Sequence, residues 1–383
     1  MLCVVGKTSG TRFLLVPSAV IGRGAEGIVY RFGDFAVKKF TEDLDALLIE
    51  KIDTLIRFAR PVPGFAWPTE NVNYEANGQA AGFVMPLATG RSLEALMDAR
   101  LTKTISTEQK IAVAISIAGA VAAAHSAPGM RICLGDVLKA ANIIIDGGEA
   151  KLVDAASVSL FGFRALDGRL IDAVSTLVTP GYVPNEVLAY PQAKPSHSGD
   201  RFALAVVLFE LIFGRSPTEP RSCAAAVGLD PDDAVRQGLF VRYVSHPELF
   251  PPTYDPIVLP PEVDDLFRAA LLGPAFHRPS GLDWIARLSA WRTAITPIPI
   301  VIPVKVNTWW PKVVRLGRRL DRIAIGVLAT TSTVLLLREA VVSGPTIAEH
   351  ARSMLFPPPL VAAPKTPTPS KPVGPELFRE MYR

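Results

Sequence analysis

The segment 21–30 constrains the fold most, because three glycines recur in it at short intervals: Gly22, Gly24 and Gly27. Glycine lets a chain turn tightly and lets backbone N–H groups lie close to a ligand. The residues that follow alternate between apolar and polar, turn at Gly33 and alternate again as far as Phe40. This pattern predicts two strands joined by a turn, whereas the glycines of a dinucleotide-binding loop lead directly into a helix.

Lys38 stands in the second predicted strand, at a fixed distance from the glycines. Inward-pointing N–H groups and one ammonium suit the oxygens of a triphosphate, so the hairpin is predicted to bind phosphate. A carboxylate is needed to hold such an ammonium in place. Glu50 is the expected partner, because it lies in the segment 43–57, whose leucines and isoleucines recur at helical spacing. Glu42 is the second choice, since it lies too near Lys38 to sit midway along that helix.

The composition favours one folded domain with an appendage. The chain has 383 residues, enough for a two-lobed domain of about 280 residues and a further segment. A hydrophobic content of 49% predicts a filled core, and a net charge of +4 argues against nucleic acid as a partner. The three cysteines show no metal-ligand spacing, which favours a reducing cytoplasm, and the N-terminal apolar run is too short for a secretory signal.

The secondary-structure pattern changes along the chain. Residues 1–88 predict short strands with one helix, and residues 89–293 predict mostly helices, so we expect an α+β fold of two lobes with these bounds. The predicted helices are 43–57, 107–125, 200–213, 262–272 and 282–288.

A second polar group follows the helix 107–125. Asp136, Lys139 and Asn142 share one predicted turn, which leads into the apolar strand 143–145, and a hairpin then brings Asp154. Together with the glycine hairpin and Lys38, in this order, these residues resemble a protein kinase domain.

The resemblance implies phosphoryl transfer from ATP with Mg²⁺. Asp136 would orient an acceptor hydroxyl and take its proton, Lys139 would lie near the transferred group, and Asn142 with Asp154 would hold the metal. The segment 83–88 resembles the hinge that binds adenine; Pro86 has no N–H, but its carbonyl and the Ala88 N–H remain for the two contacts. The expected ATP-binding residues are Ile21, Gly22, Gly24, Gly27, Val29, Ala36, Lys38, Met85, Pro86 and Ala88.

Further resemblances lie near the end of the domain. Glu186 and Arg278 match a structural ion pair of the family, and Asp200 begins a predicted core helix from which it would cap the catalytic loop. The segments 65–68, 153–157 and 182–186 resemble a bacterial branch whose members often accompany a protein phosphatase and a von Willebrand type A protein. The resemblance covers residues 12–292 and implies serine or threonine hydroxyls of protein substrates as acceptors, with a cognate phosphatase as a further partner.

The chain departs from the family pattern in three places. Leu134 and Gly135 replace the usual His-Arg, which argues against activation by loop phosphorylation. Two alanines follow Asp154 where Phe-Gly is usual, so the bulky switch residue is missing. The step from Asp136 to Asn142 is one residue longer than in the family, so either the loop bulges before Lys139 or the base is displaced.

The C-terminal part predicts a linker and an anchor. Residues 294–322 are Pro-rich and then basic, and they carry Trp309 and Trp310. Residues 323–340 predict an apolar helix that either spans the inner membrane, with membrane contact through 309–338, or docks on protein; the uncharged run 323–337 reaches only about 22 Å against the ~30 Å hydrocarbon core. If it spans, the catalytic domain faces the cytoplasm. Residues 341–383 predict a disordered, Pro-rich tail.

The sequence thus predicts a serine/threonine protein kinase that uses MgATP in bacterial signalling. Two alternatives stay open at this point. The altered Asp136 spacing allows a nucleotide-binding pseudokinase scaffold, and the shared aspartates allow a small-molecule phosphotransferase, which the Glu186 and Arg278 match disfavours.

Overall fold

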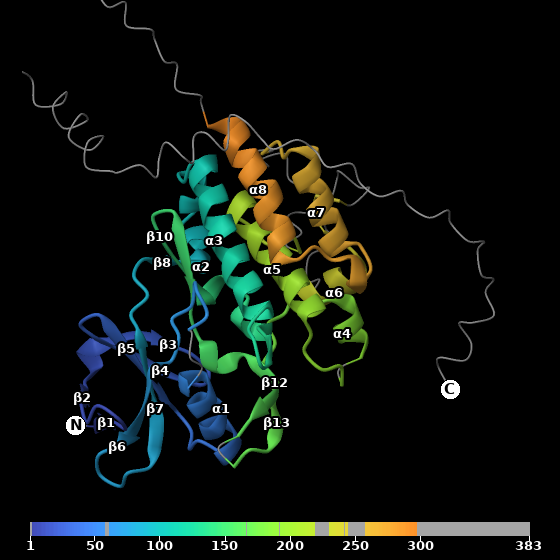
Figure 1. Cartoon of the computed structure of the whole chain (residues 1–383). Helices are drawn as coiled ribbons and strands as arrows, with labels where there is room; N and C mark the ends of the chain where they lie inside the picture. Colours follow the sequence, from blue (N-terminus) through green and yellow to red (C-terminus); the bar gives the residue numbers. More distant parts are fainter. Residues whose placement is uncertain are drawn as a thin grey trace, which may run out of the picture. The chain divides into compact units, whose positions relative to one another are not determined.

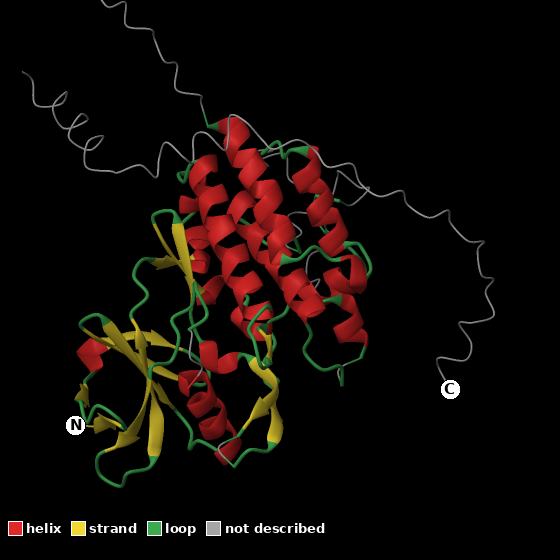
Figure 2. Cartoon of the chain, viewed as in Figure 1, coloured by secondary structure: helices red, strands yellow, loops and turns green. Residues whose placement is uncertain are grey.

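The computed structural model describes residues 2–57, 61–165, 167–190, 192–218, 230–240, 242–243 and 257–296, and the following concerns these residues. They lie in one compact unit, Met1–Pro299. A strand-rich N-lobe is followed by a helical C-lobe (Figure 1), and Figure 2 shows how strands and helices separate between the two. The predicted two-lobed α+β fold is therefore confirmed. The predicted apolar helix and proline-rich tail lie outside the described residues.

The N-lobe is built on an antiparallel sheet of seven strands in the order β2-β1-β6-β7-β5-β4-β3. The predicted pair of strands joined by a turn at Gly33 is confirmed, since β4 pairs with β5 in a register that places Val29 opposite Lys38 and closes at Phe32 and Phe35. The strands are β1 (Leu2–Gly6), β2 (Arg12–Leu15), β3 (Val20–Arg23), β4 (Gly27–Phe32), β5 (Phe35–Phe40), β6 (Glu70–Tyr74) and β7 (Ala80–Pro86).

Helix α1 (Ala46–Arg57) packs on this sheet and matches the predicted helix 43–57 except for its first turn. Ile52 and Leu55 are fully buried, and Ile52 shares a hydrophobic cluster with Phe40 and Phe83 of the sheet. Helix α1 therefore lies beside the strand that carries Lys38.

The C-lobe core surrounds α3 and α5, and α5 contains the predicted core helix that follows Asp200. Ser106 and Gln109 form a capping box that starts α3 at the predicted residue, and Ser196 caps α5 three residues earlier than predicted. The helices are α2 (Leu93–Asp98), α3 (Thr107–His125), α4 (Asn185–Ala189), α5 (His197–Phe213), α6 (Pro231–Arg236), α7 (Pro261–Leu271) and α8 (Gly281–Ile295).

Helix α3 is, among the described residues, the one helix long and apolar enough to cross a membrane by length and composition. It packs against α5 and α8, with Ile111, Ile117 and Val121 fully buried. Its apolar character is therefore that of a core helix.

Two small antiparallel sheets carry the polar loops. One has the order β11-β10-β8, and the other has the order β13-β12-β9. Strands β10 and β11 form the hairpin predicted to deliver Asp154, and β12 with β13 forms a hairpin after it. The strands are β8 (Arg91–Ser92), β9 (Arg131–Cys133), β10 (Ile143–Asp146), β11 (Glu149–Leu152), β12 (Ser159–Arg164) and β13 (Leu170–Ala173).

Candidate active site

The turn between β3 and β4 holds the glycines in a closed hairpin. The Gly24 N–H donates to the Gly27 carbonyl at 2.9 Å. A Cβ at Gly27 would lie 2.5 Å from the Lys39 carbonyl, so strand pairing requires this glycine, whereas a Cβ at Gly24 would meet no atom within 4 Å. The backbone at Gly24 is therefore open to a ligand on the side where a side chain would stand.

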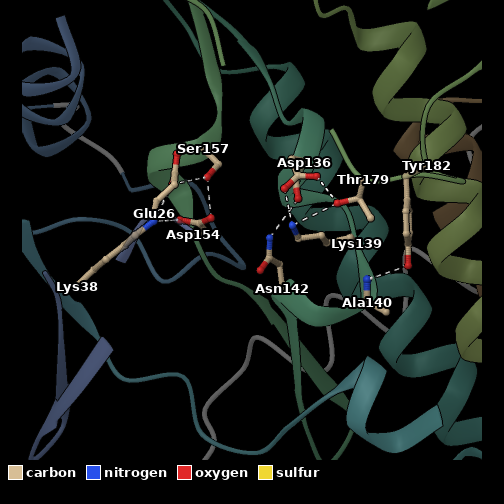
Figure 3. A network of polar contacts seen from close by, with 10 residues as sticks. All are labelled: Glu26, Lys38, Asp136, Lys139, Ala140, Asn142, Asp154, Ser157, Thr179 and Tyr182. Atoms are coloured by element: carbon tan, nitrogen blue, oxygen red, sulfur yellow. Dashed lines mark hydrogen bonds and ion pairs between the residues drawn. The ribbon is translucent and has the colours of Figure 1, made fainter. Parts of the chain in front are cut away.

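Lys38 is the centre of a polar cluster (Figure 3). Its Nζ lies 3.0 Å from Glu26 Oε2 and forms a second ion pair with Asp154, while only 7% of its side chain is exposed. Ser157 donates a hydrogen bond to Asp154 Oδ2 at 2.6 Å and lies 3.2 Å from Glu26 Oε2. The structure thus brings together Lys38 and Asp154, two residues that the sequence placed 116 positions apart.

The pKa of Asp154 reflects this cluster. Burial by itself raises the pKa, but the charge of Lys38, its hydrogen bond and that of Ser157 outweigh burial, so the pKa lies below its ordinary value. Asp154 also has a left-handed backbone, with φ of 67°. An ionised carboxylate is therefore held at the end of the β10–β11 hairpin.

Glu50 lies on α1 and accepts a hydrogen bond from Arg57 at 3.0 Å. The carboxylates that contact Lys38 in the structure are those of Glu26 and Asp154. The buried neighbour of Glu50 on α1 is Lys51, whose charge interacts with those of Glu26, Asp154 and Lys38.

Three of the expected ATP-binding residues share one hydrophobic cluster. Ala36 and Met85 are buried there, and Val29 packs against them together with Val153, the residue before Asp154. Ile21 lies on the edge strand β3 and is half exposed. The cluster therefore gives an apolar surface directly beside the Lys38 cluster.

The predicted hinge follows this cluster. Pro86 ends β7 opposite Phe35, and the Leu87 N–H donates to the Asp34 carbonyl at 2.9 Å. Leu87 is thus tied to the β4–β5 turn, which places Ala88 just beyond the end of the sheet.

The loop 134–142 contains a tight turn where the sequence predicts an additional residue. The Lys139 N–H donates to the Val137 carbonyl at 3.0 Å, and Leu138 between them has φ −82° and ψ 71°, the values of an inverse γ-turn. Leu138 is fully buried. Of the two alternatives raised by the sequence, the bulge between Asp136 and Lys139 is therefore the one that the structure contains.

Asp136 keeps its polar neighbours in spite of this turn (Figure 3). Lys139 Nζ forms an ion pair with Asp136 Oδ2, and Thr179 donates to Asp136 Oδ1 at 2.5 Å. Lys139 Nζ also donates to the Thr179 hydroxyl at 3.3 Å, and the Asn142 side-chain amide donates to the Asp136 carbonyl at 3.1 Å. The structure therefore brings together Asp136, Lys139 and Asn142, and adds Thr179.

Asp200 caps the loop that carries Asp136, as the sequence predicted. Its carboxylate accepts hydrogen bonds from the N–H groups of Leu134 and Gly135, each at 2.8 Å, and it is almost fully buried. His125 Nε2 lies 2.8 Å from the same carboxylate, and its ring stacks on His197 at 3.9 Å between centroids. The backbone just before Asp136 is therefore fixed by α5.

The segment after Thr179 is fixed at two further points. Arg278 forms a bidentate pair with Glu186, which confirms the predicted pair. Tyr182 donates to the Glu210 carboxylate at 2.8 Å and accepts from the Ala140 N–H at 3.2 Å, so it links this segment to α5 and to the catalytic loop. Burial, with the Glu210 charge, raises the pKa of Tyr182 and keeps the phenol protonated.

The donor set at this site suits a hard divalent cation. Asp154 offers carboxylate oxygens, and Asn142 donates through its amide nitrogen, which leaves its amide oxygen as a second hard ligand. Mg²⁺ uses few protein ligands of this kind and takes the rest from water and phosphate.

Sequence reasoning missed three of these residues: Glu26, Ser157 and Thr179. Glu26 stands inside the glycine segment, where a carboxylate next to a predicted phosphate site was a visible signal. Ser157 and Thr179 gave no local signal, because a serine or threonine in a loop is an ordinary turn residue.

Comparison with known proteins identifies similar chains. The family model described as the protein kinase domain matches residues 17–225, more than half of the chain. Protein BRASSINOSTEROID INSENSITIVE 1 of Arabidopsis thaliana is 38% identical over 116 residues, and the leucine-rich repeat receptor protein kinase EMS1 of the same plant is 32% identical over 124 residues. The Brassinosteroid LRR receptor kinase of Solanum lycopersicum is 39% identical over 84 residues. These matches cover 30%, 31% and 21% of this chain, but only 9%, 10% and 6% of the relatives' own lengths.

Proposed function

Because the chain belongs to the protein kinase family, we propose that it transfers the γ-phosphate of ATP to serine and threonine hydroxyls of protein substrates. The observation that carries the proposal is the convergence of Lys38 and Asp154 at one cluster and of Asp136, Lys139 and Asn142 at the next. These two clusters supply the cation and the base that phosphoryl transfer requires.

In this proposal, the apolar cluster of Val29, Ala36 and Met85 binds adenine, and the Pro86 carbonyl and Ala88 N–H orient it. Ile21 and the glycines Gly22, Gly24 and Gly27 cover the nucleotide, and Lys38 binds its phosphates. Asn142 and Asp154 would hold Mg²⁺, which neutralises charge on the phosphates when it is bound.

Asp136 then acts as the base. Its Oδ1 already accepts a hydrogen bond from the Thr179 hydroxyl, and Lys139 donates to the same hydroxyl. In this arrangement the carboxylate accepts the proton of a short aliphatic hydroxyl, and the ammonium donates to its oxygen. An acceptor serine or threonine presents the same group, which supports the proposed specificity.

The test is transfer of labelled phosphate from MgATP by the full chain to protein, peptide and small-hydroxyl acceptors. Lys38→Met and Asp154→Ala are expected to abolish transfer to a protein acceptor while near-UV circular dichroism remains unchanged. Binding of MgATP without transfer to any acceptor would favour the pseudokinase scaffold. Transfer to small hydroxyl compounds alone would favour a small-molecule phosphotransferase.

The setting is a separate proposal. The segments that resemble a bacterial branch support a role in bacterial signalling, with a cognate protein phosphatase as partner. Co-purification of the full chain with such a phosphatase tests this role.

The basic segment before the apolar run 323–337 supports a cytoplasmic catalytic domain, residues 1–293, anchored in the inner membrane by 323–340. Solubility of the full chain without detergent, together with aqueous labelling of a cysteine introduced at 337, tests the anchor: a soluble chain that is labelled at this position does not span.

A further inference from the structure

Glu26 occupies a fixed position beside Lys38. The Thr41 N–H donates to the Glu26 carbonyl at 2.9 Å, and the Thr41 hydroxyl lies 3.2 Å from the same oxygen. The end of β5 thus clamps the backbone of the glycine turn at Glu26. From this clamped backbone, the Glu26 side chain reaches Lys38, 12 residues further along the chain, at 3.0 Å.

The contact belongs to a closed ring of four polar groups (Figure 3). Lys38 pairs with Glu26 and with Asp154, and Ser157 bonds Asp154 and lies within hydrogen-bonding distance of Glu26. Ser157 is 1% exposed, so its hydroxyl has little access to water. The ring joins the glycine turn, strand β5 and the residues after β11, and it therefore couples the positions of Lys38 and Asp154.

Helix α1 contributes a different charge to this region. Its buried charged side chain is Lys51, which is attracted by Glu26 and Asp154 and repelled by Lys38. The Glu50 carboxylate accepts from Arg57 on the same helix. The charge of Lys51 thus adds to that of Lys38 in this region, and the Glu26 carboxylate attracts both ammonium groups.

We propose that Glu26 is the positioning residue for Lys38, so that the anchoring carboxylate comes from the glycine turn and not from α1. Ser157 extends the same role to Asp154. This inference rests on the proposed function for its effect on catalysis. It predicts that the glycine turn, which would cover the phosphates, and Lys38, which would bind them, move together.

Four variants of the full chain separate this proposal from its competitor. Glu26→Gln removes the charge beside Lys38 and keeps the side-chain shape, and Glu50→Gln does the same on α1. Glu149→Gln is the matched control, because Glu149 is exposed in the β10–β11 hairpin. Ser157→Ala removes the link to Asp154. Each variant is assayed for kcat, for the KM of ATP, and for acylation of individual lysines by a succinimidyl ester, measured by peptide mass spectrometry.

We expect Glu26→Gln to lower kcat about tenfold or more and to raise the KM of ATP by less than about threefold, because Lys38 remains but is no longer aligned. Acylation of Lys38 should accelerate in this variant, because an amine that Glu26 no longer holds in place reaches the ester more readily. Lys110 is buried in the C-lobe and donates to the Ile212 carbonyl. An equal rate of Lys110 acylation in the variant and in the unmodified chain would show that the fold is unchanged. Ser157→Ala should lower kcat by a smaller factor, and Glu149→Gln should match the unmodified chain.

Two results overturn the inference. One is a greater loss of kcat in Glu50→Gln than in Glu26→Gln, and the other is Lys38 acylation in Glu26→Gln equal to that in Glu149→Gln. If the unmodified chain transfers no phosphate, the proposed function fails. The acylation rates still decide whether Glu26 holds Lys38, so the two failures are distinguishable.

Discussion

Arg278 and Glu186 form a two-point ion pair across 92 residues of sequence, with Arg278 Nη2 2.8 Å from Glu186 Oε2. The arginine side chain is 4% exposed, whereas the carboxylate side chain is 40% exposed. Arg278 Nε also donates to the Ala270 carbonyl at 3.1 Å. The pair therefore ties the start of α4 to the end of α7.

Arg278→Lys is expected to lower the free energy of unfolding by about 2–4 kcal/mol, because lysine cannot donate to both carboxylate oxygens and to the carbonyl at once. Urea denaturation followed by circular dichroism measures the change. Arg292→Lys is the matched control, since Arg292 is half exposed and its ion pair with Glu108 is long, at 3.9 Å. Equal midpoints for the two variants would contradict the structural role of the pair.

Asp200→Asn is expected to lower kcat by about tenfold to a hundredfold with little change in the KM of ATP. Asparagine offers one acceptor oxygen where Asp200 accepts from Leu134 and Gly135 through two, so the backbone before Asp136 loses a fixed point. Steady-state kinetics measure both constants. An equal rise in KM would show that the change reaches the nucleotide and is not confined to the catalytic loop.

Leu138→Ala is expected to lower the free energy of unfolding by about 2–4 kcal/mol, because Leu138 is fully buried at the inverse γ-turn. Leu170→Ala, at an exposed position of β13, should change it by less than about 0.5 kcal/mol. Urea denaturation compares the two. If both variants unfold alike, burial of Leu138 does not hold the additional residue in place.

Lys51 predicts a specific dependence of stability on pH. Burial lowers the pKa of Lys51 from 10.5 to about 8, although Glu26 and Asp154 attract its charge. Between about pH 8 and pH 10.5 the unfolded chain therefore binds more protons at this residue than the folded chain, so its contribution to the free energy of unfolding rises with pH. Below about pH 8 the full cost of the buried charge is present.

Lys51→Met removes this cost. The variant should be more stable than the unmodified chain below about pH 8, and the difference should shrink by on the order of 3 kcal/mol towards pH 10.5. Urea denaturation of both chains across this range measures the difference. Comparing the two chains cancels the titrating groups that do not interact with Lys51, including Cys133, whose pKa burial raises to about 12. A difference independent of pH would contradict the low pKa of Lys51.

Much of the fold follows from local pattern. The alternation on either side of Gly33 predicted β4 and β5, and the apolar segment 107–125 with its capping box is α3. The contacts of Asp200 with the catalytic loop and of Glu186 with Arg278 were also predictable, because motif order places these residues in a known framework. In each case, the residues themselves encode the element or the pairing.

The contacts made by the turns depended on tertiary structure. The sequence left two possibilities for the additional residue before Asn142, and the buried position of Leu138 decided for the γ-turn. Thr179 reaches Asp136 across 43 residues of sequence because Tyr182 ties its segment to Glu210 on α5. No local pattern encodes such a distance.

The partner of Lys38 shows most clearly what the sequence determined and what the tertiary structure determined. The sequence determined that a lysine in this strand needs a carboxylate, and it favoured Glu50 over Glu42 without pointing to Glu26. Strand pairing and the clamp at Thr41 set Glu26 beside Lys38, while Glu50 accepts from Arg57 on α1. Residue types determine which charges must meet, but sheet register and helix orientation, which arise only when the elements pack, determine which ones do.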